Sequence, residues 1–453
     1  MDSTSLTQIA TWSGAKLTGD GSARASRVVT NSREVRAGDL FVALRGDRFD
    51  GHAFIGEVIA RGAAGVIAEA GHGERPMGAT VLEVGDTLAA LQRLAAAYRR
   101  TLSAQMVGVT GSSGKTSTKD FTFAVLSAKM RGWCTQGNLN NHIGVPLTLL
   151  NGSAAHEMAV VEMGMNHEGE IAPLASMTRP EVGIITNVGV AHIEFLGSRD
   201  AIAREKGALA SAVGPEGTVV LSAEDQFTTL IQEMTLAQVL TAGIECGDVQ
   251  AVDVQPIEGG SRFGVAYEGG RAEFELAVPG LHMVRNATMA IAAGIVLGVP
   301  LVAAAEGLRG LKLTKGRMEA RTVRGIHFLD DTYNANPDSV RAALLTLGHW
   351  PASGRRVAVL GRMAELGSFA EEGHREVGQA AVLGIDRLVT VGAEADWISD
   401  EASRQGLDEV QHFEEPVAAA AALRAFLAPG DVVLVKGSRS ARMERIIEEF
   451  ERP

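Results

Sequence analysis

The run Met106-Val-Gly-Val-Thr-Gly-Ser-Ser-Gly-Lys-Thr-Ser117 decides which fold the sequence predicts for the central part of the chain. Its first five residues are typical of a short buried strand, and the apolar residues that follow Gly114 recur at helical spacing. A glycine-rich turn in that position directs backbone N–H groups toward an anion at the helix N-terminus. Val109 stands where the strict Walker pattern has Gly, yet the strand–loop–helix context favours a phosphate-binding loop over an incidental turn.

This loop supplies the first candidate site residues. Lys115 can reach the outer phosphates of a nucleoside triphosphate, and the Thr116 hydroxyl can bind Mg²⁺. The residues expected around the phosphates are Gly111, Ser112, Ser113, Gly114, Lys115, Thr116 and Ser117.

Short apolar runs alternate with amphipathic helical stretches along the whole chain, which is typical of α/β units with parallel sheets. The expected strands cover residues 40–44, 65–68, 80–84, 106–110, 158–162, 182–187, 357–360, 387–391 and 431–435. A chain of 453 residues exceeds what one hydrophobic core usually organises, so we expect about three domains. Boundaries near Gly85 and Lys315 give domains of residues 1–84, 85–314 and 315–453.

The composition excludes several classes of protein. The net charge of −12 argues against a nucleic-acid binder, which normally carries a basic face. Two cysteines, Cys134 and Cys246, cannot form a disulfide framework and fit a reducing, cytoplasmic compartment. No charge lies between Arg285 and Glu306, but this stretch is rich in Ala and Gly and contains a proline. Two core helices broken near Gly298 are therefore expected there, and no membrane span.

Two polar residues lie where further predicted strands end. Glu162 ends the strand in Val160-Val-Glu-Met-Gly164, and His192 follows another in Asn187-Val-Gly-Val-Ala-His192. The carboxyl ends of parallel strands line one crevice, so both residues are expected to converge on the phosphate-binding loop. A carboxylate, an imidazole and a hydroxyl suit a Mg²⁺ or Mn²⁺ site beside phosphates. Either side chain alone is as well explained by a structural role, so the pair carries the hypothesis.

Three other segments are ambiguous from their residues alone. Lys206, in Arg204-Glu-Lys206, looks like a solvated helix lysine. The run Asp330-Asp-Thr-Tyr-Asn-Ala-Asn-Pro337 is dense in turn formers, so a plain polar loop is one interpretation. Paired carboxylates beside a Tyr and two Asn are, however, costly in a loop unless something binds there. Such side chains, with Arg317 in Gly316-Arg-Met-Glu319, can hold a nucleotide from a second domain.

These motifs, in their order along the whole chain, resemble those of the Mur ligases, the ATP-dependent amide-forming enzymes of peptidoglycan precursor synthesis. The matching runs are Gly111 to Ser117, Val160 to Gly164, Asn187 to His192, the Lys206 segment, His282 to Asn286, Gly316 to Glu319 and Asp330 to Pro337. Three runs are most similar to the branch that adds a D-alanyl-D-alanine dipeptide: Thr135-Gln-Gly-Asn-Leu-Asn-Asn-His-Ile-Gly-Val-Pro146, Asp330 to Pro337, and Lys436-Gly-Ser-Arg-Ser440. Asn31-Ser-Arg33 and Leu40-Phe-Val-Ala-Leu-Arg-Gly-Asp-Arg-Phe-Asp-Gly-His52 are similar to its UDP-binding domain.

The resemblance implies an α/β fold with a small UDP-binding domain, a central P-loop ATPase domain built on a parallel sheet, and a C-terminal Rossmann-like domain. It implies that Lys115 and Thr116 hold ATP phosphates and one Mg²⁺, and that a second metal is ligated by Glu162, His192 and a carbamylated Lys206. Nucleotide contacts are implied at Asn286, Arg317, Asp331, Tyr333, Asn334 and Asn336. Substrate contacts are implied at Asn31, Ser32, Arg33, Asn138, Asn140 and Asn141. The residues expected to act in catalysis are Lys115, His192, Lys206, Arg317 and Asp331.

The implied reaction is carboxylate activation. ATP phosphorylates the terminal carboxylate of UDP-N-acetylmuramoyl-tripeptide, and the amine of D-alanyl-D-alanine attacks the acyl phosphate. A carboxylate that attacks a polyanion needs charge neutralisation, which two metals, Lys115 and Arg317 would supply. The implied protein is a cytoplasmic monomer whose partners are these two substrates, with neither nucleic acid nor a membrane span.

Alternative functions remain open at this point. A Mur-type ligase for another amino acid, or a folylpolyglutamate-type synthetase, would share the phosphate-site motifs, and a substrate panel would separate them. A P-loop switch or motor would hydrolyse ATP or GTP without an acceptor and would not need the N-terminal domain that carries Asn31 to Arg33. A catalytically silent scaffold is disfavoured, because the charged residues of the implied site are all present.

Overall fold

The computed structural model describes residues 1–46, 49–73, 76–311 and 313–452. These form two compact units. The first comprises Met1–Gly108, Met130–Gly164 and Glu170–Val182, and the second comprises Val109–Lys129, Met165–Gly169 and Gly183–Pro453. Two residues of the run that resembles a UDP-binding domain, Asp47 and Arg48, lie outside the described residues.

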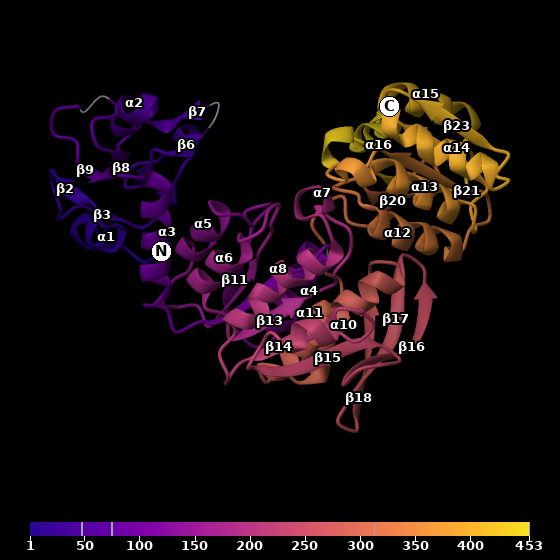
Figure 1. The fold of residues 1–453 in the computed structure, drawn as a ribbon, viewed down its shortest axis with the longest axis horizontal. Coiled ribbons are helices and arrows are strands. Elements are labelled where there is room, and N and C mark those ends of the chain that lie inside the picture. Colours follow the sequence, from indigo (N-terminus) through magenta and orange to yellow (C-terminus); the bar gives the residue numbers. More distant parts are fainter. Residues whose placement is uncertain (47–48, 74–75, 312, 453) are drawn as a thin grey trace. The chain divides into compact units, whose positions relative to one another are not determined.

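A five-stranded sheet organises the N-terminal part of the first unit (Figure 1). Its order is β2-β9-β8-β5-β4, antiparallel between β2 and β9 and parallel elsewhere. The strands are β2 Lys16–Thr18, β4 Val28–Val29, β5 Leu40–Val42, β8 Gly65–Glu69 and β9 Val81–Val84. The short pairs are β1 Thr4–Ser5 with β3 Arg24–Ala25, and β6 Arg45–Gly46 with β7 Phe49–Asp50. The helices are α1 Leu6–Ser13, α2 Ile55–Ala60 and α3 Thr87–Arg99. Phe41 and Val66 on the strands and Ile55 and Val58 on α2 bury one apolar core.

The rest of the first unit carries strands in the order β11-β12-β10. They are β10 Gln105–Thr110, of which 105–108 belong to this unit, β11 Gly132–Cys134 and β12 Met158–Glu162. Its helices are α5 Gly144–Leu150 and α6 Ile171–Thr178, and both pack against α3. All five residues of β12 are buried, as expected of a parallel strand covered on both faces.

The second unit continues with strands in the order β13-β14-β15-β16-β17-β18. They are β13 Val182–Ile185, of which 183–185 belong to this unit, β14 Thr218–Ser222, β15 Gln238–Ile244, β16 Val249–Ile257, β17 Gly260–Tyr267 and β18 Gly270–Leu276. The pairs from β14 to β16 are parallel, whereas β16, β17 and β18 form antiparallel hairpins that the expectation of parallel sheets did not include. The hairpin strands alternate buried and exposed residues, for example Glu273, Phe274 and Glu275 on β18, because one of their faces meets solvent.

The helices of this part include the stretch without charges. They are α4 Lys115–Ser127, α7 Ile193–Leu196, α8 Arg199–Ala212, α9 Thr228–Gln232, α10 Leu281–Val296 and α11 Leu301–Leu308. The predicted break is confirmed, since Gly298 adopts a φ of +74° between α10 and α11. No helix in the described part of the chain is both long and apolar enough to cross a bilayer.

A six-stranded sheet of order β19-β20-β24-β21-β22-β23 forms the C-terminal part of the second unit. Only β19 and β20 are antiparallel. The strands are β19 Glu319–Val323, β20 Ile326–Asp331, β21 Arg356–Gly361, β22 Arg387–Val391, β23 Val410–Phe413 and β24 Val432–Lys436. The helices are α12 Pro337–His349, α13 Ala370–Ala381, α14 Asp396–Arg404, α15 Pro416–Phe426 and α16 Glu444–Glu451. Helices α12 and α15 lie on opposite sides of this sheet (Figure 1), which makes it a doubly covered α/β sheet as predicted.

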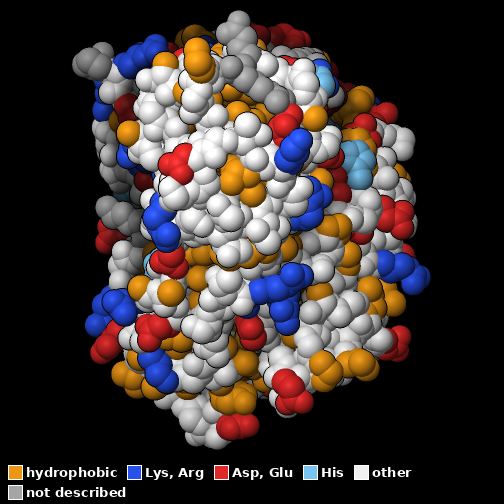
Figure 2. Space-filling model, turned by 90° about the vertical axis from the view of Figure 1, so that its left-hand side faces the viewer, with side chains coloured by type: hydrophobic (Ala, Val, Ile, Leu, Met, Phe, Trp, Pro, Cys, Tyr) orange, Lys and Arg blue, Asp and Glu red, His pale blue; other side chains and the backbone are white. Residues whose placement is uncertain are grey.

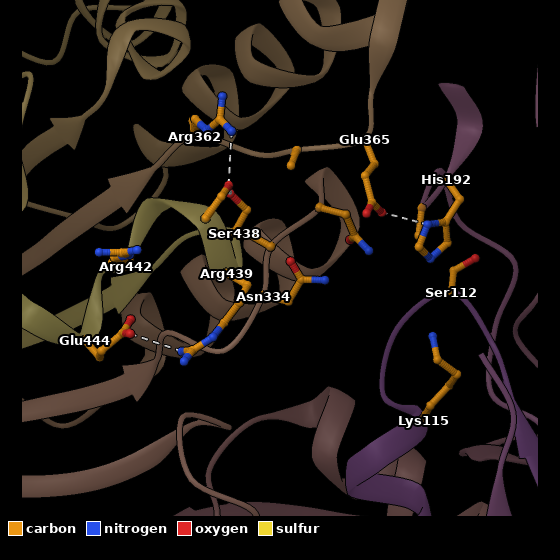
Figure 3. Close-up of a pocket in the computed structure, with 15 residues that line it drawn as sticks. Ser112, Lys115, His192, Asn334, Arg362, Glu365, Ser438, Arg439, Arg442 and Glu444 are labelled. Carbon is orange, nitrogen blue, oxygen red and sulfur yellow. Dashed lines mark hydrogen bonds and ion pairs between the residues drawn. The ribbon is translucent and has the colours of Figure 1, made fainter. Parts of the chain in front are cut away.

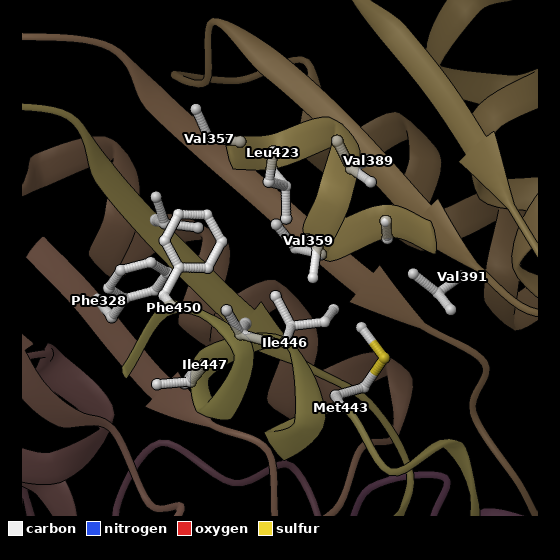
Figure 4. Close-up of a cluster of buried hydrophobic side chains, with 14 of the residues drawn as sticks. Phe328, Val357, Val359, Val389, Val391, Leu423, Met443, Ile446, Ile447 and Phe450 are labelled. Carbon is white, nitrogen blue, oxygen red and sulfur yellow. The ribbon is translucent and has the colours of Figure 1, made fainter. Parts of the chain in front are cut away.

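One core cluster shows how this sheet is held together (Figure 4). Alternate strand residues such as Val357 and Val359 point to one face, where Leu423 of α15 and Phe450 of α16 cover them. Phe328 of β20 is fully buried, and its ring centroid lies 5.1 Å from that of Phe450. This buried apolar cluster thus holds in place the strands whose ends reach the candidate site.

We expect Phe328→Ala to destabilise the C-terminal part of the second unit by about 3–5 kcal/mol, because it removes a buried ring and leaves a cavity. The measurement is chemical denaturation followed by tryptophan fluorescence, with the exposed Leu383→Ala as the matched control. A loss as small as that of the control would show that the cluster does not stabilise this sheet.

The surface carries charges of both signs. On the face drawn in Figure 2, Lys and Arg side chains are interspersed with Asp and Glu side chains. This mixture agrees with a chain that has 42 basic and 54 acidic residues.

Candidate active site

The phosphate-binding loop lies between β10 and α4, as predicted. Gly111 and Gly114 have φ angles of +150° and +79°, in the region that favours glycine. A Cβ at Gly111 would lie 1.8 Å from Thr186 Oγ1, and one at Gly114 would lie 2.6 Å from Asn286 Nδ2. Both glycines are therefore required by close approach as well as by conformation, and Asn286 packs directly against the loop.

The residues that follow β13 brace this loop. The Ser113 amide donates to Asn187 Oδ1 at 3.0 Å, and Asn187 Nδ2 donates to the Ser113 carbonyl at 3.0 Å. The Thr186 hydroxyl donates to the same carbonyl at 2.6 Å, while Lys115 Nζ donates to the Gly111 carbonyl at 2.7 Å. Motif analysis gave no role to Thr186 or Asn187, although Asn187 begins the run that leads to His192 and Thr186 stands directly before it.

Arg317 reaches the loop from the C-terminal part of the second unit. Its Nη2 donates to Thr116 Oγ1 at 3.0 Å, and its guanidinium lies 4.1 Å from the centroid of the Tyr333 ring. A guanidinium held by an aromatic face keeps its charge and its direction. Arg317 therefore contacts the phosphate-binding loop directly, through Thr116.

Much of the polar run 330–337, which one interpretation took for a plain loop, belongs to regular elements. Strand β20 continues through Asp331 and α12 begins at Pro337, so only residues 332–336 lie between elements. Asp331 Oδ2 accepts from Lys436 Nζ at 2.6 Å, and the same ammonium donates to the Asn334 carbonyl at 2.9 Å. Lys436, which is 3% exposed, is a further residue of this region that motif analysis did not single out for a role.

Asn336 and its neighbour Asp338 touch the central part of the unit. Asn336 Nδ2 donates to Ser113 Oγ at 3.0 Å, and Asn336 Oδ1 accepts from the Ser339 amide as the cap of α12. Asp338 Oδ2 accepts from the Val190 amide at 3.0 Å, two residues before His192. The C-terminal part therefore contacts both the phosphate-binding loop and the loop that carries His192.

His192 is held in a left-handed conformation with a φ of +65°. Its Nδ1 lies 2.7 Å from Oε2 of Glu365. Burial lowers the pKa of His192, although the facing Glu365 carboxylate raises it, so the imidazole is neutral near pH 7. Glu365 was not predicted, because nothing in its local sequence marks it.

The interpretation of Lys206 as a solvated helix lysine is wrong, because the side chain is buried. The side chain is 1% exposed on α8, on the face that also buries Ile202, Ala203, Leu209 and Ala210. Burial lowers the pKa of its ammonium well below the ordinary value, and the nearby Lys115 charge lowers it further. The spacing of these apolar residues at three and four positions around Lys206 was the signal that could have revealed its burial.

A cavity of about 830 Å³ opens between these elements of the second unit (Figure 3). Ser112, Lys115 and His192 line one side, and residues of the C-terminal part line the other. The C-terminal residues are Asn334, Ala335, Asn336, Arg362, Ala364, Glu365, Ser438, Arg439, Ser440, Arg442 and Glu444. The predicted loop and the Lys436-Gly-Ser-Arg-Ser440 run thus share one cavity.

In the first unit, Glu162 ends β12 with its side chain 2% exposed. Its Oε1 accepts from Asn140 Nδ2 at 2.7 Å, while its buried Oε2 has no hydrogen-bond partner among the described residues. Asn141 Oδ1 accepts from the amides of Ile143 and Gly144, just before and at the start of α5, and Asn138 is exposed. Across the described ranges, no three His, Cys, Asp or Glu side chains gather in a group that could hold a metal.

The N-terminal candidates surround the short helix η1, Ser32–Glu34. Asn31 Oδ1 accepts from the Arg33 amide at 3.1 Å, and Arg61 Nη1 donates to the carbonyls of Ser32 and Arg33 at 3.2 and 3.1 Å. Ser32 is buried, whereas Arg33 is exposed and available to a ligand.

Three family models match the chain. The Mur ligase family catalytic domain matches residues 24–99, the Mur ligase middle domain matches 109–294, and the Mur ligase glutamate ligase domain matches 316–439. The UDP-N-acetylmuramoyl-tripeptide–D-alanyl-D-alanine ligase of Bacillus subtilis is 38% identical over 93% of this chain and 92% of its own length.

Two solved structures are similar over nearly the whole length. MurF from Acinetobacter baumannii superposes with a TM-score of 0.91 and 33% identity, covering all of both chains. MurF from Thermotoga maritima in complex with ADP gives a TM-score of 0.83 and 32% identity, covering 94% of this chain and 97% of that one. The chain therefore belongs to the Mur ligase family and is a three-domain, ATP-dependent ligase.

Proposed function

We propose that this protein joins D-alanyl-D-alanine to UDP-N-acetylmuramoyl-tripeptide in the cytoplasm, with ATP converted to ADP and phosphate. The observation that carries the proposal is similarity along almost the entire chain to ligases named for this reaction. The geometry of the second unit supports it, because a phosphate-binding loop, Arg317 and a cavity with further arginines lie together there.

The chemistry requires that one anion attack another. A carboxylate oxygen of the tripeptide forms a bond to the terminal phosphorus of ATP, and the bond to ADP breaks. Lys115 and Arg317 supply positive charge around the loop, so the repulsion between carboxylate and triphosphate falls. The dipeptide amine then forms the amide bond, and phosphate leaves with the electron pair of the broken acyl–oxygen bond.

The structure supports a cation at Glu162. A buried carboxylate oxygen without a hydrogen-bond partner is costly unless a cation neutralises it, and Glu162 Oε2 is such an atom. We propose Thr116 as a ligand of one Mg²⁺, and Glu162 and His192 as ligands of a second. Mg²⁺ bound by these residues would neutralise charge on the phosphate oxygens. The neutral imidazole of His192 suits this role, because a protonated ring has no lone pair to offer.

We propose that Lys206 carries a carbamate. Burial and the nearby Lys115 charge lower the pKa of Lys206 and so favour its neutral amine, the form that can add to CO₂ with loss of one proton. The product is an anion whose oxygens suit Mg²⁺. An unmodified ammonium in the same place would repel the cation.

The remaining assignments follow the family motifs at matching positions. We propose nucleotide contacts at Asn286, Asp331, Tyr333, Asn334 and Asn336, with Asp331 acting through its ion pair with Lys436. We propose substrate contacts at Asn31, Ser32, Arg33, Asn138, Asn140 and Asn141. We also propose domains of residues 1–84, 85–314 and 315–453, each of which would bind one of the three ligands.

An ADP-release assay tests this function. We expect ADP formation to continue only when ATP, UDP-N-acetylmuramoyl-tripeptide and D-alanyl-D-alanine are all present. Omission of each in turn is the control, and glutamate and diaminopimelate replace the dipeptide in parallel assays. Turnover with glutamate or the diamino acid, and none with the dipeptide, would assign the protein to another branch of the family. Sustained hydrolysis without an acceptor would indicate a P-loop switch.

A further inference from the structure

Glu365 stands out among the residues of the cavity because no part of the proposed phosphate chemistry uses it. It comes from the loop after β21, and its side chain is 44% exposed toward the cavity beside His192 (Figure 3). Its one ion-pair partner in the described part of the chain is His192, at 2.7 Å. The rest of the carboxylate faces the cavity, where a ligand can reach it.

The loop holds Glu365 in a conformation that non-glycine residues rarely adopt. Its φ is +63°, and such a backbone persists only where the surrounding structure enforces it. Met363 and Leu366 on either side are 1% and 2% exposed, so they anchor the loop in the core. The Met363 amide also donates to Nε2 of the buried His374 at 2.9 Å. The buried side chains of Met363 and Leu366 thus hold the loop so that the Glu365 carboxylate faces the cavity, in spite of its strained backbone.

The other acidic residue that lines the cavity is already paired. Glu444 Oε1 accepts from Arg439 Nη1 at 3.1 Å. The same wall presents Arg362, which donates to Ser440 Oγ at 3.1 Å and lies 3.7 Å from Oε2 of Glu394. It also presents Arg442, which has no ion-pair partner among the described residues. In Figure 3, Glu365 lies at the His192 side of the cavity and Arg442 at the opposite side. The cavity therefore has the Glu365 carboxylate at one end and guanidinium groups at the other, of which that of Arg442 has no ion-pair partner in the described part of the chain.

This charge arrangement fits a zwitterion. A free dipeptide at neutral pH carries an ammonium at one end and a carboxylate at the other. The ammonium end also has to approach the activated carbonyl, which forms where Lys115 holds the phosphates. Glu365 shares its side of the cavity with Lys115 and His192, whereas the arginines do not. Only one orientation of the dipeptide then satisfies both ends.

We propose that Glu365 binds the ammonium group of the incoming dipeptide and holds that nitrogen close to the activated carbonyl. The nitrogen attacks once it has lost one proton to water, as the free amine. The inference rests on the proposed function and adds to it a residue that selects a free amino terminus. Glu365, in the C-terminal part of the unit, recognises the dipeptide and does not act in forming the acyl phosphate.

The test compares Glu365→Gln with wild type and with Glu372→Gln. Glu372 is an exposed residue of α13 outside the cavity lining, so its substitution makes the same change of charge on the same part of the fold. The first measurement is the KM for D-alanyl-D-alanine. We expect Glu365→Gln to raise it about 10- to 100-fold, as for the loss of one charge-assisted hydrogen bond. Glu372→Gln should leave it unchanged.

Two further measurements show whether Glu365 recognises the dipeptide ammonium or only holds the His192 side chain in place. In a single turnover without dipeptide, Glu365→Gln should form ADP from ATP and UDP-N-acetylmuramoyl-tripeptide as wild type does. N-propionyl-D-alanine, which keeps the carboxylate and lacks the ammonium, should inhibit both enzymes equally. An unchanged KM for the dipeptide, or loss of the single-turnover ADP, overturns the inference while wild type remains active. A wild type that does not use the dipeptide overturns the proposed function itself.

Discussion

Glu162→Gln is expected to lower kcat by about two to three orders of magnitude while leaving the affinity for ATP within about threefold of wild type. The substitution keeps the shape of the side chain and its contact with Asn140, which lies 2.7 Å from Oε1. It removes the negative charge whose buried Oε2 lacks a partner among the described residues. If that oxygen binds Mg²⁺, the loss falls on the transition state, where charge accumulates on the phosphate oxygens.

The measurements are steady-state ADP release and the binding of a fluorescent ATP analogue. His192→Ala should behave in the same way, because the proposal assigns both residues to one cation. Glu216→Gln, an identical change at an exposed loop residue, is the matched control and should turn over as wild type does. Normal turnover of both Glu162→Gln and His192→Ala would contradict the metal site. Loss of ATP binding in either would indicate a structural role.

The parts of the fold that the sequence predicts well are those encoded by neighbouring residues. The apolar run that forms β12, the glycine-rich loop before α4 and the break at Gly298 each depend on a local pattern, and the structure has all three. The hairpins from β16 to β18 were missed because strand direction depends on which segments pair, and that is not a local property. The alternation of charged and apolar residues on β18, which is typical of a strand with one exposed face, was nevertheless visible in the sequence.

The residues of the candidate site also fall into those that a local pattern predicts and those that it does not. The loop residues Gly111 and Lys115 could be identified from spacing alone. Asn187, Glu365 and Lys436 could not, because each acts on a group far away in the chain: Asn187 on Ser113, Glu365 on His192, and Lys436 on Asp331. A polar residue whose partner lies more than 70 positions away leaves no periodic signal. The sequence predicts the phosphate loop itself and leaves open which side chains brace it.

Lys206→Met is expected to reduce kcat on the order of 100- to 1000-fold, comparable with the loss of a transition-state charge stabiliser. Methionine retains the length and apolar contacts of the side chain on the buried face of α8, so the fold should survive. The substitution removes the nitrogen whose neutral form is favoured, because burial and the Lys115 charge lower the pKa of Lys206. Steady-state ADP release and thermal unfolding together measure whether the loss is catalytic.

Wild-type protein should in addition respond to bicarbonate. Because carbamates decompose when protonated, activity in bicarbonate-depleted buffer at mildly acidic pH should fall and return when bicarbonate is restored. With ¹³C-labelled bicarbonate, a carbamate carbonyl resonance should appear in wild type and be absent from Lys206→Met.

Lys119→Met is the matched control for that resonance. Lys119 is also buried, at 3% exposure, but it forms an ion pair with Asp120, so it should contribute no carbamate signal. The resonance should therefore persist in Lys119→Met. A signal that disappeared in Lys119→Met and remained in Lys206→Met would place the modification elsewhere. Indifference of wild-type activity to bicarbonate, with no resonance, would leave a neutral amine at Lys206. Since an amine brings no negative charge to a cation, Glu162 and His192 would then have to hold the second Mg²⁺ without it.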